Sequence, residues 1–348
     1  MILALETSCD DTCAAVLDPG GQIRSNVISS QGVHDRYGGV VPEVASRHHL
    51  ELVNAVVDDA LHQASIGLDD VELVAVTRGP GLVGALLVGV QTAKGLAAAR
   101  RLPLAPVDHL HGHVAANLVA PSFAPPFLCL IASGGHTLIC HVHDEGRYEV
   151  LGRTLDDAAG EAFDKGARML GLGYPGGPAL ERLARDGDPA AFDFPTAKRV
   201  EGLDFSFAGL KTALLYALRD LGDDPPRADL AASYQDAIVR ALLDRVERAL
   251  AQTGLERLAL GGGVAANGPL RERAAKLAPE VHVPPIALCT DNAAMIASAA
   301  RFVPALPYPA YLGLDAYATG EAGQSPAVVG QPEADRPHQH AGPDAPGR

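Results

Sequence analysis

Apolar residues along the chain follow two different periods, and segments of the two kinds alternate. Short runs that are apolar at most positions and end at glycine, proline or charged residues predict β-strands. These runs cover residues 1–5, 13–17, 73–77, 126–132, 137–143, 258–261 and 281–284. Longer segments with apolar residues three or four positions apart predict helices. They cover residues 41–65, 81–100, 159–170, 178–186, 209–221, 228–253, 269–278 and 292–302. This alternation predicts an α/β protein rather than a sandwich or a helical bundle.

Two stretches of the chain share one pattern, in which a small polar turn separates two apolar strands. They are residues 3–18 (LALETSCDDTCAAVLD) and 129–144 (CLIASGGHTLICHVHD). Each turn would direct backbone N–H groups and hydroxyls out of the sheet, where they can hold a phosphate. A third turn, residues 260–267 (LGGGVAAN), follows a strand and precedes a helix, and its glycines permit close backbone approach. One such turn alone would indicate only a tight turn, but the three in this order favour a duplicated nucleotide-binding cleft.

The length of 348 residues exceeds what one hydrophobic core usually sustains, so we expect two lobes. We place the first lobe at residues 1–125, with the helix over 292–302 packing back onto it, and the second lobe at 126–291. Residues 313–348 are expected to form an irregular segment and a tail. From residue 319 onward the chain is rich in Gly and Pro and has almost no large apolar side chain, which predicts disorder.

The composition narrows the class of partner and the compartment. The chain has 28 Lys and Arg against 42 Asp and Glu, a formal net charge of −14, which disfavours binding of nucleic acid through a broad basic face. The five cysteines form no CxxC pair, so we expect neither a disulfide framework nor a cysteine zinc site. The first residues do not resemble a secretory signal, and no apolar run is long enough to cross a bilayer. We therefore expect a cytoplasmic protein with no membrane segment.

The sequence DHLHGH, residues 108–113, indicates metal chemistry. His109 and His113 are four positions apart, so on a helical turn their rings share one face, while His111 points elsewhere. Asp291, which opens a predicted helix, is the best candidate for a third ligand of iron(II), zinc or manganese. Two simpler explanations stay open. Loop histidines are often satisfied by backbone carbonyls, and an Asp before a helix is often its N-cap.

Acidic residues at helical spacing occur at Asp157, Glu161 and Asp164. A solvated helix face explains most such stripes. The small residues that precede this stripe and the YPGGP turn (174–178) that follows it favour close approach of a ligand instead.

Ten motifs occur along the chain in the order found in one family. They are ETSCDDT (6–12), VPEVASRHHLE (41–51), RGPGLVGALLVG (78–89), HLHGH (109–113), SGGHT (133–137), DDAAGEAFDK (156–165), YPGGP (174–178), DFSFAGLKTA (204–213), GGGVAAN (261–267) and CTDNAAMIA (289–297). On these motifs the chain resembles the bacterial tRNA N6-adenosine threonylcarbamoyltransferase family, the TsaD family, over about residues 1–302. The resemblance implies a duplicated actin-like ATPase (ASKHA) fold, with two lobes around a nucleotide-binding cleft.

The same resemblance implies an activity. A threonylcarbamoyl group would pass from L-threonylcarbamoyladenylate to N6 of the adenosine 3′ of the anticodon (position 37), in tRNAs that read ANN codons, with release of AMP. It also implies that His109, His113 and Asp291 bind one divalent metal, with Fe(II) expected before zinc. The residues implied to hold the adenylate are Ile131, Ala132, Ser133, Gly134, Gly135, Asp164, Gly177 and Asn267. The implied partners are tRNA, a smaller paralogous (TsaB-like) subunit and a P-loop ATPase (TsaE-like).

An exocyclic adenine amine is a poor nucleophile, so some group should take its proton, and Asp10 or Asp11 is the candidate base. Two positions depart from the family pattern. His111 stands where bacterial members usually carry Glu, and residues 312–317 replace an Arg-Pro-Arg-Trp segment. These departures leave open what His111 does and whether the C-terminal end contacts a partner.

Rival functions make different demands on these residues. A sugar-type or acetate-type kinase of the same fold would use the same hairpins for Mg-ATP, but it has no need of two histidines four apart. A metalloprotease of the HExxH type needs Glu directly after the first histidine, where this chain has Leu110. A catalytically inactive scaffold would have lost the metal residues, and this chain retains all three.

Overall fold

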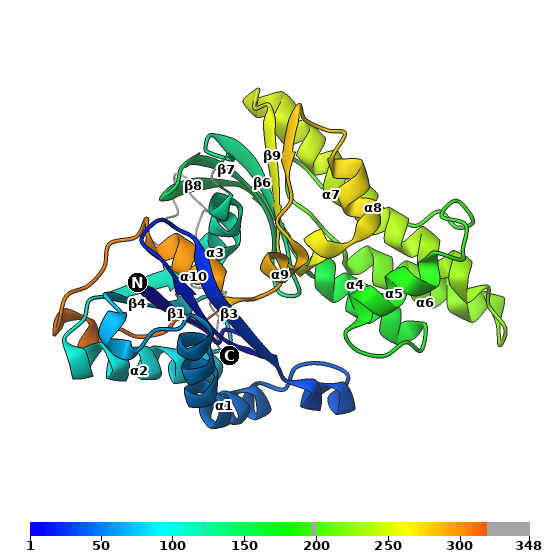
Figure 1. The fold of residues 1–348 in the computed structure, drawn as a ribbon. Coiled ribbons are helices and arrows are strands. Elements are labelled where there is room, and N and C mark those ends of the chain that lie inside the picture. Colours follow the sequence, from blue (N-terminus) through cyan, green and yellow to red (C-terminus); the bar gives the residue numbers. More distant parts are fainter. Residues whose placement is uncertain (121, 197–199, 319–348) are drawn as a thin grey trace, which may run out of the picture.

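The structure is a computed structural model that describes residues 1–120, 122–196 and 200–318. Two five-stranded sheets, each with helices packed against it, form two lobes (Figure 1). The predicted α/β class is therefore confirmed. The disorder predicted from residue 319 onward lies outside the described residues. Among the helices that are described, none combines the length and the apolar character needed to cross a membrane.

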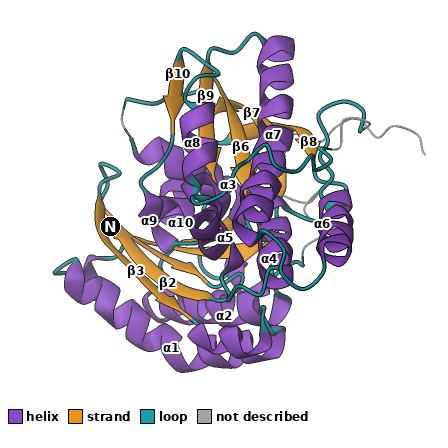
Figure 2. Cartoon of the chain, turned by 90° about the vertical axis from the view of Figure 1, so that its right-hand side faces the viewer, coloured by secondary structure: helices purple, strands orange, loops and turns teal. Residues whose placement is uncertain are grey.

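The first sheet contains the hairpin predicted over residues 3–18. Its strands are β1 (Ile2–Glu6), β2 (Asp11–Leu17), β3 (Ile23–Ser30), β4 (Leu73–Gly79) and β5 (Leu104–Asp108), in the order β3-β2-β1-β4-β5. β1 pairs antiparallel with β2 and parallel with β4. Side chains alternate across β1, so Leu3 and Leu5 join the core under α1 (Pro42–Gln63) and α2 (Val83–Arg100), while Ala4 joins the core on the other face. Figure 2 shows α1 and α2 below this sheet and α10 (Ala293–Ala300) above it.

The second sheet repeats the first. Its strands are β6 (Phe127–Ala132), β7 (Thr137–Asp144), β8 (Arg147–Arg153), β9 (Arg257–Gly261) and β10 (Glu280–His282), in the order β10-β9-β6-β7-β8. β6 pairs antiparallel with β7 and parallel with β9, as β1 does with β2 and β4. Position by position the two sheets have the same strand order and the same pairing sense, so the predicted duplication is confirmed.

The helices of the second lobe cover the outer face of its sheet. They are α4 (Ala159–Met169), α5 (Gly176–Ala184), α6 (Ala208–Leu221), α7 (Arg227–Thr253) and α8 (Gly268–Ala274), and a short α9 (Ile286–Cys289) follows β10. Leu128 and Leu130 of β6 face these helices, whereas Cys129 and Ile131 face a core that both sheets share. That shared core also holds Val114 of α3 (His109–Ala115), so the two lobes are packed together around α3 and α10.

Three strands and two α-helices lie outside the ranges that the apolar pattern predicted, namely β3, β5, β8, α3 and α9. Of the two helices, α3 has only seven residues and directly follows β5. β3 and β8 lie at sheet edges and carry polar side chains (IRSNVISS and RYEVLGR), so they lack a continuous apolar run. β5 has a proline at its middle, and α9 is a single turn. Two predicted helices are also shorter than expected. The helix predicted over 269–278 ends at Ala274 (α8), and the one predicted over 292–302 ends at Ala300 (α10).

Candidate metal centre and adjoining cleft

The helix α3 starts where β5 ends, and Asp108 sets its first turn. The Asp108 carboxylate accepts hydrogen bonds from the backbone N–H groups of Leu110 (2.9 Å) and His111 (3.1 Å), as an N-cap residue does. His109 and His113 therefore lie one turn apart on one helix face, as their spacing predicts. Their ring centroids are 4.7 Å apart and the rings are nearly perpendicular.

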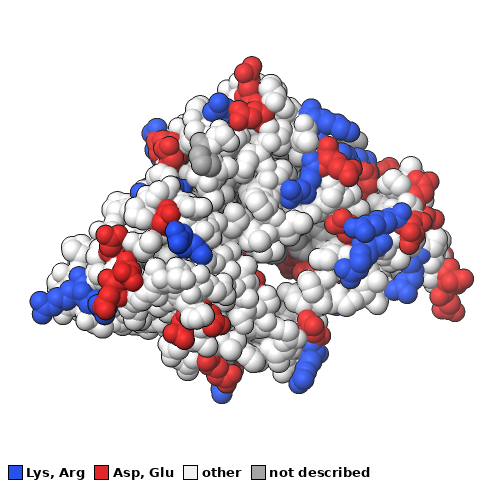
Figure 3. Space-filling view, viewed as in Figure 1, with Lys and Arg blue, Asp and Glu red and all other residues white. Residues whose placement is uncertain are grey.

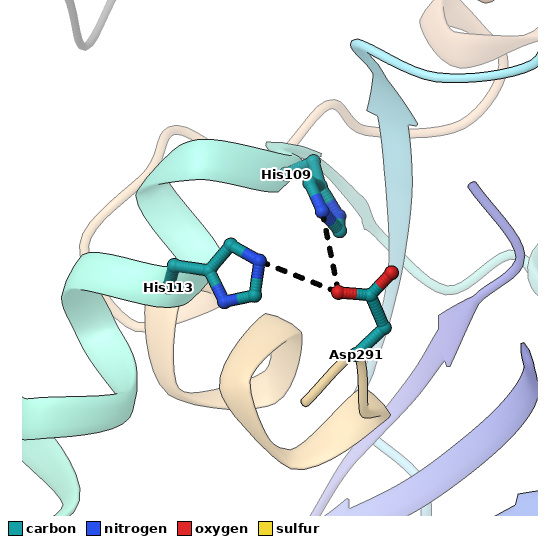
Figure 4. Close-up of side chains that lie close together, drawn as sticks. All are labelled: His109, His113 and Asp291. Atoms are coloured by element: carbon teal, nitrogen blue, oxygen red, sulfur yellow. Dashed lines mark ion pairs between the residues drawn. The ribbon is translucent and has the colours of Figure 1, made fainter. Parts of the chain in front are cut away.

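Asp291 approaches these two rings from the second lobe, just after α9. One of its carboxylate oxygens lies 3.5 Å from His109 Nε2 and 3.3 Å from His113 Nε2 (Figure 4). The three ligand atoms lie within 4.8 Å of one another. Imidazole and carboxylate ligands at about 2.0–2.1 Å from a tetrahedral ion are about 3.3 Å apart, so this donor set fits a divalent metal.

The simpler explanations for these residues do not hold. Asn292, not Asp291, caps α10, because its side-chain oxygen accepts the N–H of Met295 at 2.9 Å. Neither ring nitrogen of the fully buried His113 has a hydrogen-bond partner among the described residues. A buried imidazole whose Nε2 has only the Asp291 carboxylate near it in the described part of the chain, at 3.3 Å, is an environment that a metal ion would complete.

A carboxylate behind His109 orients its ring. Nδ1 of His109 lies 3.0 Å from Glu6 Oε2 and 3.2 Å from Ser8 Oγ, which directs Nε2 toward Asp291. Glu6 is fully buried and also accepts a hydrogen bond from the Thr77 hydroxyl. A carboxylate bonded to the far nitrogen of a ligand histidine is the usual support of a metal site. Glu6 opens the ETSCDDT motif, but it was not among the predicted site residues.

The charges at this centre depend on one another. Burial alone would lower the pKa of His109, but the Asp291 and Glu6 carboxylates outweigh it and raise that pKa to about 9. For Asp291, burial acts to raise the pKa, and the neighbouring His109 and His113 hold it well below the usual range. Without a metal, the ionised carboxylate is thus balanced by a protonated histidine, so binding of a cation would release a proton.

His111 lies on the other face of α3, as predicted. Its Nε2 contacts the Glu145 carbonyl at 2.9 Å, and its ring lies 5.9 Å from that of Tyr148. Burial lowers the pKa of His111. It is therefore a neutral core residue, and it is not part of the candidate metal centre.

A cavity of about 590 Å³ lies between the two hairpin turns. On one side it is lined by Asp10 and Asp11 of the first turn, and on the other by Ser133, Gly134 and Gly135 of the second; His109, His136 and Asp291 also line it. Burial raises the pKa of Asp11 to about 7, with the charges of Asp291 and Asp10 adding to the shift. Burial lowers the pKa of His136 to about 4, helped by the charge of His109. The sequence analysis assigned His136 no role.

A second cavity of about 400 Å³ adjoins the first and shares Gly134 and Gly263 with it. Three further predicted residues, Asp164, Gly177 and Asn267, line this second cavity. The third predicted turn, residues 260–267, forms another wall of this second cavity. There Gly262 has φ +84°, and a Cβ on it would lie 2.3 Å from the Ala132 carbonyl oxygen, so only glycine fits.

Some of the predicted residues do not direct their side chains into the cleft. The Ile131 side chain lies in the shared core and that of Ala132 in the outer core, because both belong to the buried strand β6. Neither lines the two cavities. The Asn267 amide is occupied within the protein, since it accepts the Leu270 N–H and donates to Glu181 and Gln235.

The chain is similar in sequence to known proteins over most of its length. A family model described as "TsaD: tRNA N6-adenosine threonylcarbamoyltransferase" matches residues 22–298. A protein of that name from Anaeromyxobacter dehalogenans (strain 2CP-1) is 56% identical over 311 residues, which are 86% of this chain and 92% of the relative. One from Clostridium botulinum (strain 657) is 51% identical over the same shares.

A solved structure with a similar fold is that of T. kodakarensis HypF. It covers 86% of this chain and 47% of the HypF chain, at 16% identity and a TM-score of 0.59. At this identity the likeness shows the fold alone, and it agrees with the predicted two-lobed actin-like architecture.

Proposed function

The chain belongs to the tRNA N6-adenosine threonylcarbamoyltransferase family, and we propose that it performs the family's acyl transfer in the cleft between the two hairpin turns. The donor is L-threonylcarbamoyladenylate, and the acceptor is N6 of adenosine 37 in tRNAs that read ANN codons. In the reaction N6 bonds to the carbamoyl carbon, the bond from that carbon to the phosphate oxygen breaks, AMP leaves and N6 loses a proton. The observation that carries the proposal is the His109, His113 and Asp291 cluster beside the two turns.

His109, His113 and Asp291 would hold one divalent metal, with Fe(II) preferred and zinc as the alternative. Two imidazoles and one carboxylate suit either ion and leave positions open. A metal held there supplies Lewis acidity toward an oxygen of the threonylcarbamoyl group. Glu6 keeps the His109 ring in the orientation that such binding needs.

The adenylate would lie along the second turn and into the smaller cavity. Gly134 and Gly135 have no atom within 4 Å of where a Cβ would be, so their backbone can meet a phosphate without steric hindrance. Asp164 and Gly177 line the cavity that the nucleoside would enter. Asn267 acts indirectly, because its amide positions Glu181, which lines the same cavity.

Asp11 is the proposed base for the N6 proton. It lines the cleft, and its pKa is about 7. Near neutral pH such a group is partly ionised and still basic enough to accept a proton, which is what a general base needs. Asp10 lines the cleft beside it. Because the donor is already activated, orientation and exclusion of water can supply much of the remaining rate enhancement.

The net charge of −14 argues for shared binding of tRNA. Figure 3 shows one face of the molecule with acidic and basic side chains interspersed and no continuous basic area among the described residues. We therefore propose that a smaller paralogous subunit and a P-loop ATPase work with this chain in the cytoplasm, and that the paralogous subunit contributes to holding the tRNA.

Reconstitution separates this function from its rivals. The chain, its two partners, tRNA and pre-formed adenylate should together yield AMP and N6-threonylcarbamoyladenosine. A kinase would instead consume ATP with a small-molecule acceptor in the absence of tRNA, and a metalloprotease would cleave a protein substrate. High turnover in either of those assays, with tRNA left unmodified in the complete mixture, would contradict the proposal.

A further inference from the structure

The last described residues, 304–318, form a strap that returns across the first lobe after α10. Leu306 pairs with Leu104 of β5 through two backbone hydrogen bonds of 2.8 and 2.9 Å. Further along, the nearly buried Lys94 of α2 donates to the carbonyls of Leu312 and Leu314. The strap is therefore fixed to the lobe at several points before it reaches its end at Tyr317.

Tyr317 ends the strap at the wall of the cleft. Its backbone N–H donates to the Arg78 carbonyl at 3.2 Å, and the Arg78 guanidinium lies 5.5 Å from the centre of its ring. Its hydroxyl lies 2.9 Å from the Gly79 carbonyl and within hydrogen-bond distance of one Asp108 oxygen. Gly79 leads into Pro80 and Gly81, which line the larger cavity.

Asp108 is held at both of its oxygens. One oxygen caps α3 through the N–H groups of Leu110 and His111, and the other faces the Tyr317 hydroxyl. The Tyr317 hydroxyl has a single proton to donate, and a carboxylate is a stronger acceptor than a carbonyl. The hydroxyl therefore donates to Asp108 rather than to the Gly79 carbonyl. The Tyr148 hydroxyl also lies 3.5 Å from the capping oxygen. Together these contacts restrict rotation of the Asp108 carboxylate, and they therefore help to hold the first turn of α3, which begins with His109.

We propose that Tyr317 is a positioning residue for the metal centre, acting through Asp108 on the first turn of α3 and so on His109. The expected effect of Tyr317 on ion binding rests on the proposed metal site. The expected effect of Tyr317 on the order of α3 does not depend on that site. Tyr317 gives the strap a role at the cleft, although the strap contains none of the three candidate metal ligands and lies outside residues 22–298, which the family model matches.

The test compares two tyrosine-to-phenylalanine variants of the same strap. Tyr317→Phe keeps the buried ring and removes only the hydroxyl. Tyr311→Phe is the matched control, because this tyrosine is also buried and its hydroxyl has no hydrogen-bond partner among the described residues. Metal affinity by chelator competition should fall about tenfold in Tyr317→Phe and stay unchanged in Tyr311→Phe.

Amide hydrogen exchange gives a second readout that needs no metal. In Tyr317→Phe the amides of Leu110 and His111 should exchange faster than in the wild type, while those of α1 should not. A chain that ends at Ala318 should match the full chain in both measurements, and one that ends at Asp315 should match Tyr317→Phe.

Wild-type metal affinity in Tyr317→Phe would overturn the proposal, and so would wild-type exchange at Leu110 and His111. If the wild type itself binds no metal, the proposed metal site fails, and the exchange comparison alone then decides whether Tyr317 orders α3.

Discussion

The two lobes share one strand order and one pairing pattern, but their hairpin turns carry opposite chemistry. The first turn follows Glu6 and contains Asp10, with Asp11 at the start of β2, whereas the second, residues 133–136, contains Ser133, Gly134 and Gly135. Both turns line the same cavity. Carboxylates repel a phosphate, and bare backbone N–H groups attract one. In the proposed function, the second lobe would therefore supply the anion site and the first lobe the proton acceptor.

The candidate metal centre, in contrast, combines residues from equivalent places in both lobes. His109 and His113 lie on α3, which directly follows β5, and Asp291 follows β10 after the single turn of α9. β5 and β10 are corresponding edge strands of the two sheets. Each lobe therefore supplies part of one ligand set, and neither lobe contains the set by itself.

The largest effects should come from removing a ligand of either lobe. His109→Ala and Asp291→Ala should each lose the bound metal and the transfer activity, because two remaining ligands compete poorly with water. His111→Ala is the control from the same helix and should keep the metal, since its ring lies on the opposite face. Elemental analysis decides the matter, and a full equivalent of metal in either of the first two variants would refute the two-lobe ligand set.

The acidic turn should govern the pH dependence. Asp11 acts as base only when ionised, so the transfer rate should rise with pH through about 7 and level off above it. Asp11→Asn should lower the plateau rate by about 10²-fold or more and remove this rise. Asp10→Asn should keep the rise. If Asp11→Asn retains the wild-type pH profile in single-turnover assays, Asp11 is not the base.

Making the second turn resemble the first should weaken adenylate binding. Gly135→Asp introduces a carboxylate where space is free, so the variant should fold but bind a stable adenylate analogue at least about tenfold more weakly. Gly135→Asn adds nearly the same volume without the charge and should lose much less. Calorimetry that finds equal affinities for the two variants would mean that the phosphate does not lie at this turn.

The smallest effect should come from removing the tail. Deleting residues 319–348 should shift the melting temperature by less than about 4 °C and leave adenylate binding unchanged, because a Gly/Pro-rich segment has few apolar contacts to lose. A larger drop in a thermal melt would show that the tail packs on the lobes.

Local patterns predicted most of the fold and all three residues of the candidate metal centre, but not the groups that support them. The spacing of His109 and His113 is a property of one helix, and the two hairpins are each continuous in sequence. The edge strands β3 and β8 were not predicted, because polar side chains interrupt the apolar run by which a strand is recognised. Glu6 and Tyr317 reach α3 from 103 and 209 residues away, so no local pattern could reveal them. The family resemblance assigned Ile131 and Ala132 to the ligand together with the turn that follows them, whereas the pleat of β6 places their side chains in the cores.

The most direct test of the central claim measures metal and product in the same samples. Wild-type chain and His113→Ala, each with tRNA, pre-formed adenylate and both partners, would be analysed for bound metal and, by mass spectrometry, for modified nucleosides. The wild type should hold about one equivalent of metal and form N6-threonylcarbamoyladenosine, and His113→Ala should do neither. Modified tRNA from a metal-free His113→Ala sample would contradict the account.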